Sequence, residues 1–576
     1  MPEENHAGLL LFVFWVWTDD GLCAGKLDPL QRGRAGTAVF GIADAERKMR
    51  AFDALVILFQ FCEYTLVNPI GQGVICLELQ FEREEISCIK PVLWDVQDLE
   101  QTQELRIPEG MPPVGHVLAF WGQPVLRSKE WMRDSLEISA GIQIWGLYQP
   151  ESGGKPCCLE TWIPFRMDWN LPENLPEGVA RIVLLPRFVD VRPVSAGKLM
   201  IRAGIAALAE CWVPEVYETM HPASDMPKEV QLLKQNYPLR LPREAGEKTF
   251  SMEESLTLPP SVPQPEKVIY HRVEPEITDR KVLGNKLVFR GNGKLHLLYE
   301  SEEGQLCSWD FEFPFSQFAP LNGSYSPDAQ ADILPVVTSS ELEQDQDGML
   351  HFRAGICAQY MVDDRMMLEV TEDAYCPGRA VTVQQKELQL PALLDARREV
   401  VSGQAEVSGR MDMMADCTVM PDFPRQRRTE DGLLLEVPGV CQMLWYNEEG
   451  SLQSASQRWE GKLPMKMDEE ARLYVLPQNA GERHINADGE NIRAMIQVPM
   501  QLWTMSGQGI PVVTSMTVEE QGQKDPSRPS LILRRANGES LWQIARESGS
   551  TMEAIREATG FTGEPENGKM LLIPVV

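Results

Sequence analysis

The sequence predicts a mainly β protein, in which tandem β-sandwich-like repeats are followed by a small βααβ domain at residues 530–576. Three observations predict this architecture. A sequence pattern recurs at a spacing of 151 residues, as in the step from Arg202 to Arg353. Apolar and polar residues alternate with a period of two inside the copies, which is typical of half-buried strands. Two helix-capping patterns lie close together in residues 540–553.

The composition excludes several partners. The 576 residues include 54 Lys and Arg against 84 Asp and Glu, for a net charge of −30. Such a charge argues against nucleic acid or an anionic membrane surface as the main partner, because both carry negative phosphates. No apolar run approaches the roughly 20 residues that a membrane-spanning helix needs. The 12 cysteines are scattered, so we expect free and mostly buried thiols.

Residues 1–76 differ in texture from the rest of the chain. Aromatic clusters alternate there with Arg-rich stretches, without sustained helical or strand periodicity. Strand-like alternation starts at Leu77. We hypothesise that 1–76 is an over-long gene prediction, and the alternative is a genuine but poorly packed extension.

The internal repeat organises the rest of the chain. Segments 197–205 and 348–356 share the pattern Gly-x-Leu-x-(Ile/Phe)-Arg-Ala-Gly-Ile, and the same spacing separates Tyr148 from Tyr299. One register kept over such a length indicates a duplicated module. A degraded third copy is visible in residues 388–496.

These patterns give the expected domain organisation. The expected segments are a doubtful extension at 1–76, repeat 1 with its lead-in at 77–240, repeat 2 at 251–381, a degenerate repeat 3 at 382–518, a linker at 519–529 and the C-terminal domain at 530–576. Residues 215–242 and the Pro-rich stretch 259–265 read as linkers, and 228–236 as a short helix.

Two residues of the repeated pattern have specific expectations. The glycine of Arg-Ala-Gly-Ile, Gly204 or Gly355, marks a bulge or a close backbone approach within a strand. The arginine before it, Arg202 or Arg353, is expected to be an edge or snorkelling residue. A binding role for this arginine is the alternative.

The C-terminal domain has the clearest local signals. Residues 530–535 read as a strand, and Ser540 to Gln543 form a capping box that opens a helix. A second capping box runs from Ser550 to Glu553, and Gly560 ends the second helix. Residues 569–574 read as the closing strand.

The pattern Gly538-Glu-Ser-Leu-Trp-x-Ile-Ala, with the later Gly568-Lys-Met-Leu-Leu-Ile-Pro, resembles the lysin motif (LysM) domain. Two positions depart from the usual motif of that family. Glu539 replaces an Asp, and Thr559 replaces an Asn. In LysM domains this Asn orders the loop that flanks the sugar groove, so its replacement weakens the case for glycan binding.

The repeats resemble the spore-coat-associated (SPOCS) domain of endospore-forming Firmicutes. The features that carry the resemblance are a lead-in with Pro112 or Pro263, a strand that ends in Leu-Tyr, an acidic turn with glycine, and a Pro-Phe pair. Tandem SPOCS domains that end in a LysM domain are similar to the architecture of clostridial spore coat morphogenesis proteins.

This resemblance implies a non-enzymatic sporulation adaptor that helps to localise and assemble the spore coat around the forespore, from the mother-cell cytoplasm. Its LysM domain is expected to dock on the coat morphogenetic ATPase, stage IV sporulation protein A, and its repeats to contact other coat proteins. The alternative is a protein that binds peptidoglycan or chitin-type glycans at the cell wall or cortex. That alternative requires export, for which the sequence shows no signal.

The expected partner- or glycan-binding residues lie in two loops and at the start of the first helix: Gly538, Glu539, Ser540, Leu541, Trp542, Thr559, Gly560 and Phe561. Trp542 and Phe561 are residue types that anchor interfaces. Core packing is the alternative for Trp542, and a loop plug is the alternative for Phe561. The histidines are isolated and no catalytic or metal-binding motif occurs, so we expect no catalytic residue, metal or cofactor.

Overall fold

The computed structural model describes residues 14–18, 21–25, 76–78, 81–223, 227–346, 348–430, 432–467, 470–478, 481–507, 509–519 and 529–575. The chain divides into two compact units, Met1–Val74 and Ile75–Val576. In the first unit, strands β1 (Phe14–Thr18) and β2 (Gly21–Gly25) pair as an antiparallel hairpin. Most of residues 1–76 and of the expected linker lie outside the described residues, so the hypothesis about 1–76 stays a hypothesis.

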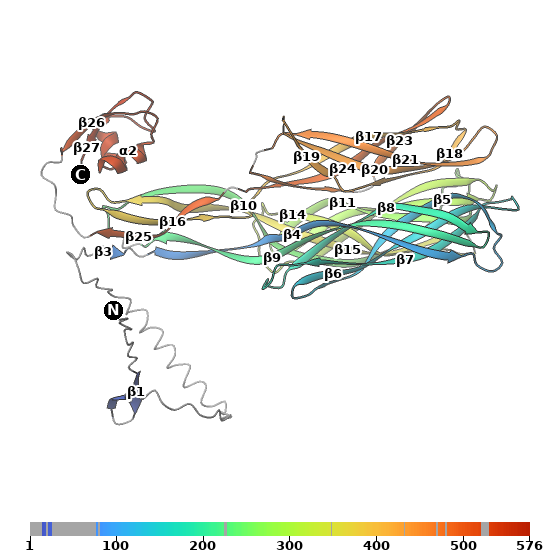
Figure 1. Ribbon diagram of the computed structural model, residues 1–576, viewed down its shortest axis with the longest axis horizontal. Helices are drawn as coiled ribbons and strands as arrows, with labels where there is room; N and C mark the ends of the chain where they lie inside the picture. Colours follow the sequence, from blue (N-terminus) through green and yellow to red (C-terminus); the bar gives the residue numbers. More distant parts are fainter. Residues whose placement is uncertain are drawn as a thin grey trace, which may run out of the picture. The chain divides into compact units, whose positions relative to one another are not determined.

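Repeat 1 consists of six long strands in two antiparallel sheets (Figure 1). The strands are β4 (Phe81–Arg106), β5 (Val114–Trp131), β6 (Ser135–Pro150), β7 (Cys157–Asn170), β8 (Val179–Ser195) and β9 (Lys198–Pro222). One sheet has the order β4-β9-β8 and the other has the order β5-β6-β7.

Repeat 2 has the same topology. Its strands are β10 (Gln231–Leu256), β11 (Pro265–Leu283), β12 (Lys286–Ser301), β13 (Leu306–Pro320), β14 (Gln330–Gln344) and β15 (Leu350–Tyr375). The sheet orders are β10-β15-β14 and β11-β12-β13. Each strand overlaps the corresponding strand of repeat 1 when the sequence is shifted by 151 residues, so the two repeats have matching strands at the spacing seen in the sequence. The predicted boundary at residue 240 falls inside β10.

Repeat 3 keeps this layout with shorter strands. They are β16 (Val381–Leu388), β17 (Leu393–Ser408), β18 (Met413–Pro421), β19 (Arg425–Thr429), β20 (Gly432–Tyr446), β21 (Leu452–Met465), β22 (Arg472–Pro477), β23 (Glu482–Asp488), β24 (Asn491–Met505) and β25 (Ile510–Glu519). β24 pairs with β17, β22 and β23, and β20 pairs with β18, β19 and β21. β25 pairs with β16 and with β3 (Cys76–Glu78).

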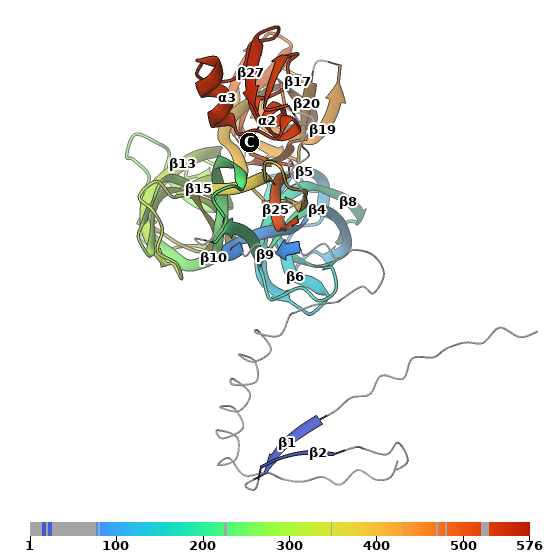
Figure 2. The same cartoon turned by 90° about the vertical axis from the view of Figure 1, so that its left-hand side faces the viewer.

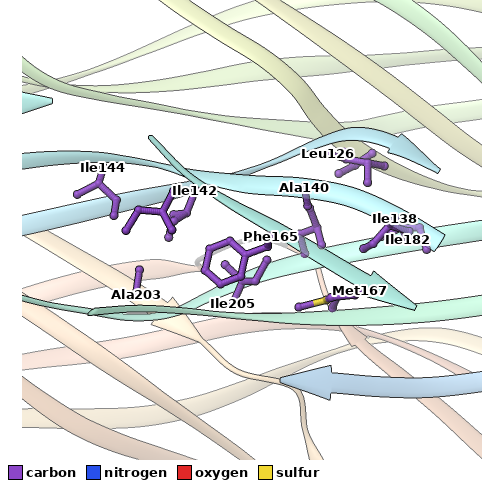
Figure 3. Close-up of a cluster of buried hydrophobic side chains, with 14 of the residues drawn as sticks. Leu126, Ile138, Ala140, Ile142, Ile144, Phe165, Met167, Ile182, Ala203 and Ile205 are labelled. Atoms are coloured by element: carbon purple, nitrogen blue, oxygen red, sulfur yellow. The ribbon is translucent and has the colours of Figure 1, made fainter. Parts of the chain in front are cut away.

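Each repeat buries the side chains that its two sheets turn toward each other. In repeat 1, alternate residues of β6, among them Ile138 and Ile142, meet Phe165 of the same sheet and Ile182 and Ile205 of the opposite sheet (Figure 3). This alternation is the period that predicts a sandwich, and the mainly β fold class is confirmed.

The repeated glycine lies where the sequence predicts a bulge. The register shifts beside Phe188, which is opposite Gly204, and beside Ser339, which is opposite Gly355. A Cβ atom on Gly204 would lie 2.6 Å from the Phe188 ring. The arginines of the pattern are exposed, and each pairs with a glutamate of the neighbouring strand, Arg202 with Glu100 and Arg353 with Glu253.

The three sandwiches lie around a common centre (Figure 2). Arg181 of repeat 1 is fully buried and has partners in more than one repeat. Its guanidinium donates to Glu210 at 2.7 Å and to Asp332 of repeat 2 at 2.9 Å. The same guanidinium lies 6.0 Å from the ring centroid of Trp503 in repeat 3. One side chain therefore contacts all three repeats.

Apolar side chains from all three repeats surround this buried charge. They are Ile89, Ala206, Leu208, Trp212, Leu334, Met361, Leu393, Phe423, Leu476, Trp503 and Met505. A further cluster joins the ends of the long strands, where Ile86, Leu241 and Ile510 meet. The repeats thus share buried cores and form one body.

Two local expectations are wrong. Residues 215–242 lie largely in β9 and β10, and the expected helix at 228–236 is replaced by the start of β10. β10 pairs with β15 along its whole length, so tertiary pairing overrides the weak helical preference. The Pro-rich stretch 259–265 connects β10 to β11 inside repeat 2.

Substitution of Arg181 by Leu is expected to destabilise the folded chain by about 3–5 kcal/mol, because it leaves two buried carboxylates without their cation. Urea unfolding of the full chain measures the loss. Arg202→Ala, which breaks an exposed pair, is the matched control and is expected to cost less than about 1 kcal/mol. A similar small loss for both variants would contradict the role assigned to Arg181.

Candidate interaction site in the C-terminal domain

The C-terminal domain folds in the predicted order. Its elements are β26 (Leu531–Arg535), α2 (Leu541–Ser548), α3 (Met552–Thr559) and β27 (Met570–Pro574), and β26 pairs antiparallel with β27. In the described part of the chain no helix is long and apolar enough to cross a membrane.

The capping chemistry sets the start of each helix. At α2 the predicted capping box forms, because Ser540 Oγ accepts from the Gln543 amide at 3.2 Å and Gln543 Oε1 accepts from the Ser540 amide at 3.1 Å. At α3 the cap is Thr551, whose Oγ1 accepts from the Ala554 amide at 3.1 Å. The sequence predicted Ser550 as the cap of this helix, so that prediction is wrong by one residue. Ser550 itself is buried.

The first loop is fixed by Glu539. Its carboxylate accepts from the Asn537 amide at 2.8 Å and pairs with Arg534 at 2.8 Å. These two interactions lower the pKa of Glu539 below its ordinary value. Gly538 has a φ of 94°, a backbone conformation that favours glycine, and its Cα is exposed.

The second loop is tied to the first by Glu564, whose Oε2 accepts from the Leu541 amide at 2.7 Å. The carboxylate satisfies an amide in the first turn of α2, where negative charge is favoured. Sequence reasoning missed Glu564, because it lies 23 residues from its partner and no local pattern links the two.

Thr559 performs a structural task at the end of α3. Its Oγ1 accepts from the Leu572 amide at 3.0 Å and donates to the Leu572 carbonyl at 3.2 Å, which holds α3 against β27. Beyond it, Gly560 is exposed and Phe561 is half-buried. The Lys569 ammonium lies 4.4 Å from the centroid of the Phe561 ring.

Trp542 makes a contact that joins α2 to repeat 2. The residue is 5% exposed, and its Nε1 donates to Asp373 Oδ2 at 2.8 Å. Its ring meets Tyr375 edge to face at a centroid distance of 4.7 Å. Arg546 pairs with the same Asp373 at 2.6 Å, and the Tyr375 hydroxyl donates to the Ser550 carbonyl at 2.8 Å.

The eight predicted site residues therefore fall into separate environments. Leu541 is in the domain core and Trp542 is covered by repeat 2. Glu539, Thr559 and Phe561 are half-buried, whereas Gly538, Ser540 and Gly560 are exposed. We use the name loop face for Gly538, Ser540, Gly560 and Phe561, the part of the predicted site that a partner can reach without displacing α2.

Among the histidines that the structure describes, His296 is the one whose two ring nitrogens both lie beside carboxylates. Its Nδ1 lies 2.5 Å from Asp310, its cross-strand neighbour, and its Nε2 lies 2.8 Å from Asp416 of repeat 3. Asp416 also accepts from the Trp121 indole of repeat 1 at 3.0 Å. Both ring nitrogens are thus engaged by carboxylates, so this histidine ties the repeats together and presents neither nitrogen to a substrate.

A cavity of about 750 Å³ lies beside His296 between repeats 2 and 3 and carries charges of both signs, such as Arg483 and Glu482. Within the described residues, no group of His, Cys, Asp and Glu side chains is arranged to hold a metal ion. The nine cysteines from Cys88 to Cys441 are free, and six of them are buried.

Asp373 holds the covered face of α2 through Trp542 and Arg546. Asp373→Ala removes the acceptor shared by Trp542 and Arg546, and a hydrogen bond to a charged group contributes about 1.5–3 kcal/mol. We expect the variant to release α2 and to raise the hydroxyl-radical labelling rate of Trp542 and Tyr375 severalfold. Asp395→Ala, at the exposed pair with Arg397, is the control. Equal labelling of both variants and the wild type would contradict the contact.

The His296 tie generates a second prediction. Burial lowers the pKa of His296, but the carboxylates of Asp416 and Asp310 raise it by more. The pKa of His296 therefore lies above its ordinary value of 6.5. A raised histidine pKa stabilises the fold below pH 6.5, and this contribution is lost as the pH rises through the folded-state pKa.

The stability advantage of the wild type over His296→Gln should therefore be larger at about pH 6 than at about pH 9 in urea unfolding. A pH-independent difference between the wild type and His296→Gln would count against this assignment.

Comparisons with known proteins point to one family. The model of the family described as SipL, SPOCS domain matches residues 264–343, which cover most of strands β11 to β14 of repeat 2. Neither the curated proteins nor the solved structures gave a match. The matched segment contains the Leu-Tyr strand end, the acidic turn and the Pro-Phe pair on which the sequence resemblance rests. It supports a relationship to SipL-like proteins and a role related to sporulation.

Proposed function

We propose that the protein is a non-enzymatic adaptor that helps to localise and assemble the spore coat around the forespore. The observation that carries this proposal is the match of repeat 2 to the SipL SPOCS domain family. The resemblance to this family implies the mother-cell cytoplasm at the forespore surface as the proposed location. The proposed partners are the coat morphogenetic ATPase, stage IV sporulation protein A, and other coat proteins.

The architecture is consistent with an adaptor. An adaptor must present its binding surfaces in a fixed arrangement, since a preorganised surface loses less entropy when it binds. The repeats share the buried centre around Arg181, and α2 of the C-terminal domain is held by Asp373 and Tyr375. Several surfaces on one such body would combine weak contacts into a stable assembly.

We assign docking on the ATPase to the loop face of the C-terminal domain. Phe561 is its aromatic residue and is half-buried, so part of its ring remains open to a partner. Gly538 and Gly560 add exposed backbone on either side. Trp542 would join this surface only if the contact with Asp373 opens.

Capture of the ATPase by the full chain tests the assignment. We expect that removal of residues 530–576 abolishes capture and that Phe561→Ala weakens it by about tenfold or more, the usual loss for an interface anchor. Leu533→Ala is the matched control, because Leu533 is 65% exposed on β26 of the same domain. Equal recovery with and without 530–576 would reject docking through this domain.

The alternative role is binding of peptidoglycan or chitin-type glycans at the cell wall or cortex. A titration of the full chain with a chitin oligosaccharide separates the two roles. The adaptor proposal expects no saturable binding. Saturable binding that Phe561→Ala removes would favour the glycan-binding role instead.

A further inference from the structure

Repeat 3 departs from repeats 1 and 2 at one position that the other two use to close their cores. Trp131, Val282 and Arg428 occupy equivalent positions, because each pairs with the first leucine of the next strand: Leu136, Leu287 and Leu433. Trp131 packs against the core of repeat 1, and Val282 is 2% exposed in the core of repeat 2. In repeat 3 the residue is an exposed arginine.

The strand that carries this arginine is an exposed edge. All five residues of β19 are exposed, and in the described part of the chain β19 pairs only with β20. Its side chains alternate between two faces. Gln426 and Arg428 share the inward face with Leu435 and Leu433, whereas Arg425 and Arg427 share the outward face with Glu436 and Leu434.

A groove of about 480 Å³ opens on the inward face of β19, at the seam between repeat 3 and repeat 1. Apolar and aromatic side chains line it, among them Leu433, Tyr474 and Trp94 of β4. Trp94 and Tyr474 meet edge to face at 4.6 Å. Gln426, Arg428 and Arg472 complete the lining.

The charge of this strand is opposite to that of the chain. β19 has three arginines and no acidic residue, although the net charge of the protein is −30. Arg427 pairs with Glu436 across the ladder at 3.0 Å, with its side chain still 62% exposed. An arginine at a position where an apolar residue would close the core reduces the buried apolar area of repeat 3. Residues that are unfavourable for the local fold are expected mainly at functional positions.

We propose that β19 and this groove bind an extended, acidic segment of a partner protein, which adds to the sheet as a further strand. The edge of β19 offers backbone groups for such pairing. Residues of the added strand that face inward would place apolar side chains in the groove. Those that face outward would place carboxylates against Arg425 and Arg427.

This surface is separate from the C-terminal domain and does not depend on the adaptor proposal. A protein segment fits it better than nucleic acid does, because the ligand gains backbone hydrogen bonds from the strand edge. The charge of the rest of the chain also repels a polyanion that extends beyond β19.

A peptide of alternating Glu and Val, labelled with fluorescein, tests the proposal on the full chain. We expect saturable binding of this peptide, together with slower hydrogen exchange of the β19 amides. The Lys-Val peptide of the same length and a single-stranded oligothymidylate should not bind. Absence of Glu-Val binding, or equal binding of the Lys-Val peptide or the oligothymidylate, would overturn the proposal.

Two variants test the residues. The triple substitution Arg425→Glu, Arg427→Glu and Arg428→Glu should weaken Glu-Val binding at least tenfold. The control is the triple substitution Arg202→Glu, Arg353→Glu and Arg493→Glu. Each of these arginines pairs with a glutamate of a neighbouring strand, and their replacement changes the net charge equally and should have little effect. If both triple variants weakened binding equally, the peptide would be responding to the net charge of the protein alone, and the proposal would be overturned.

Arg428→Val gives repeat 3 the residue type that repeat 2 has at the equivalent position, Val282. We expect it to raise the midpoint of urea unfolding and to weaken peptide binding, because the groove closes. This variant keeps the proposal testable if the triple variant fails to fold. Unchanged peptide binding by a folded Arg428→Val would contradict the assigned role of the groove.

Discussion

The buried charge of Arg181 constrains the arrangement of the whole body. A guanidinium that is buried away from water is stable only beside groups of opposite charge. For Arg181 these groups are Glu210 of the same repeat and Asp332 of repeat 2. Trp503 of repeat 3 covers the same group. Any slip of one repeat against another would separate these groups and leave an uncompensated buried charge, so this contact favours a single arrangement. Asp416, His296 and Trp121 add a second junction to which all three repeats contribute.

This arrangement determines which surfaces remain for partners. The inner faces of the repeats are used by their shared cores, and α2 of the C-terminal domain is used by its contact with β15. The loop face and β19 are two surfaces that stay open, and they differ in chemistry. The loop face combines an aromatic ring with exposed glycines, whereas β19 combines an open strand edge with arginines. Two surfaces of different chemistry suit a protein that joins unlike partners.

Much of the fold could be predicted from the sequence, because its signals are periodic or local. The recurrence from Arg202 to Arg353 predicted the duplicated sandwich, and the Ser540 capping box predicted α2. The failures involve long-range pairing. The residues expected to form a helix at 228–236 belong to β10 because β15 supplies a partner along the whole strand. Nothing local indicated that Trp542 would meet Asp373, 169 residues away, or that Glu564 would cap α2.

The central claim is that the three repeats behave as one body held by shared buried cores. Differential scanning calorimetry of the full chain tests this claim most directly, because domains with their own independent cores melt separately. The account predicts one cooperative transition for the three repeats together, with any second transition confined to the C-terminal domain. Separate transitions for the individual repeats would contradict it.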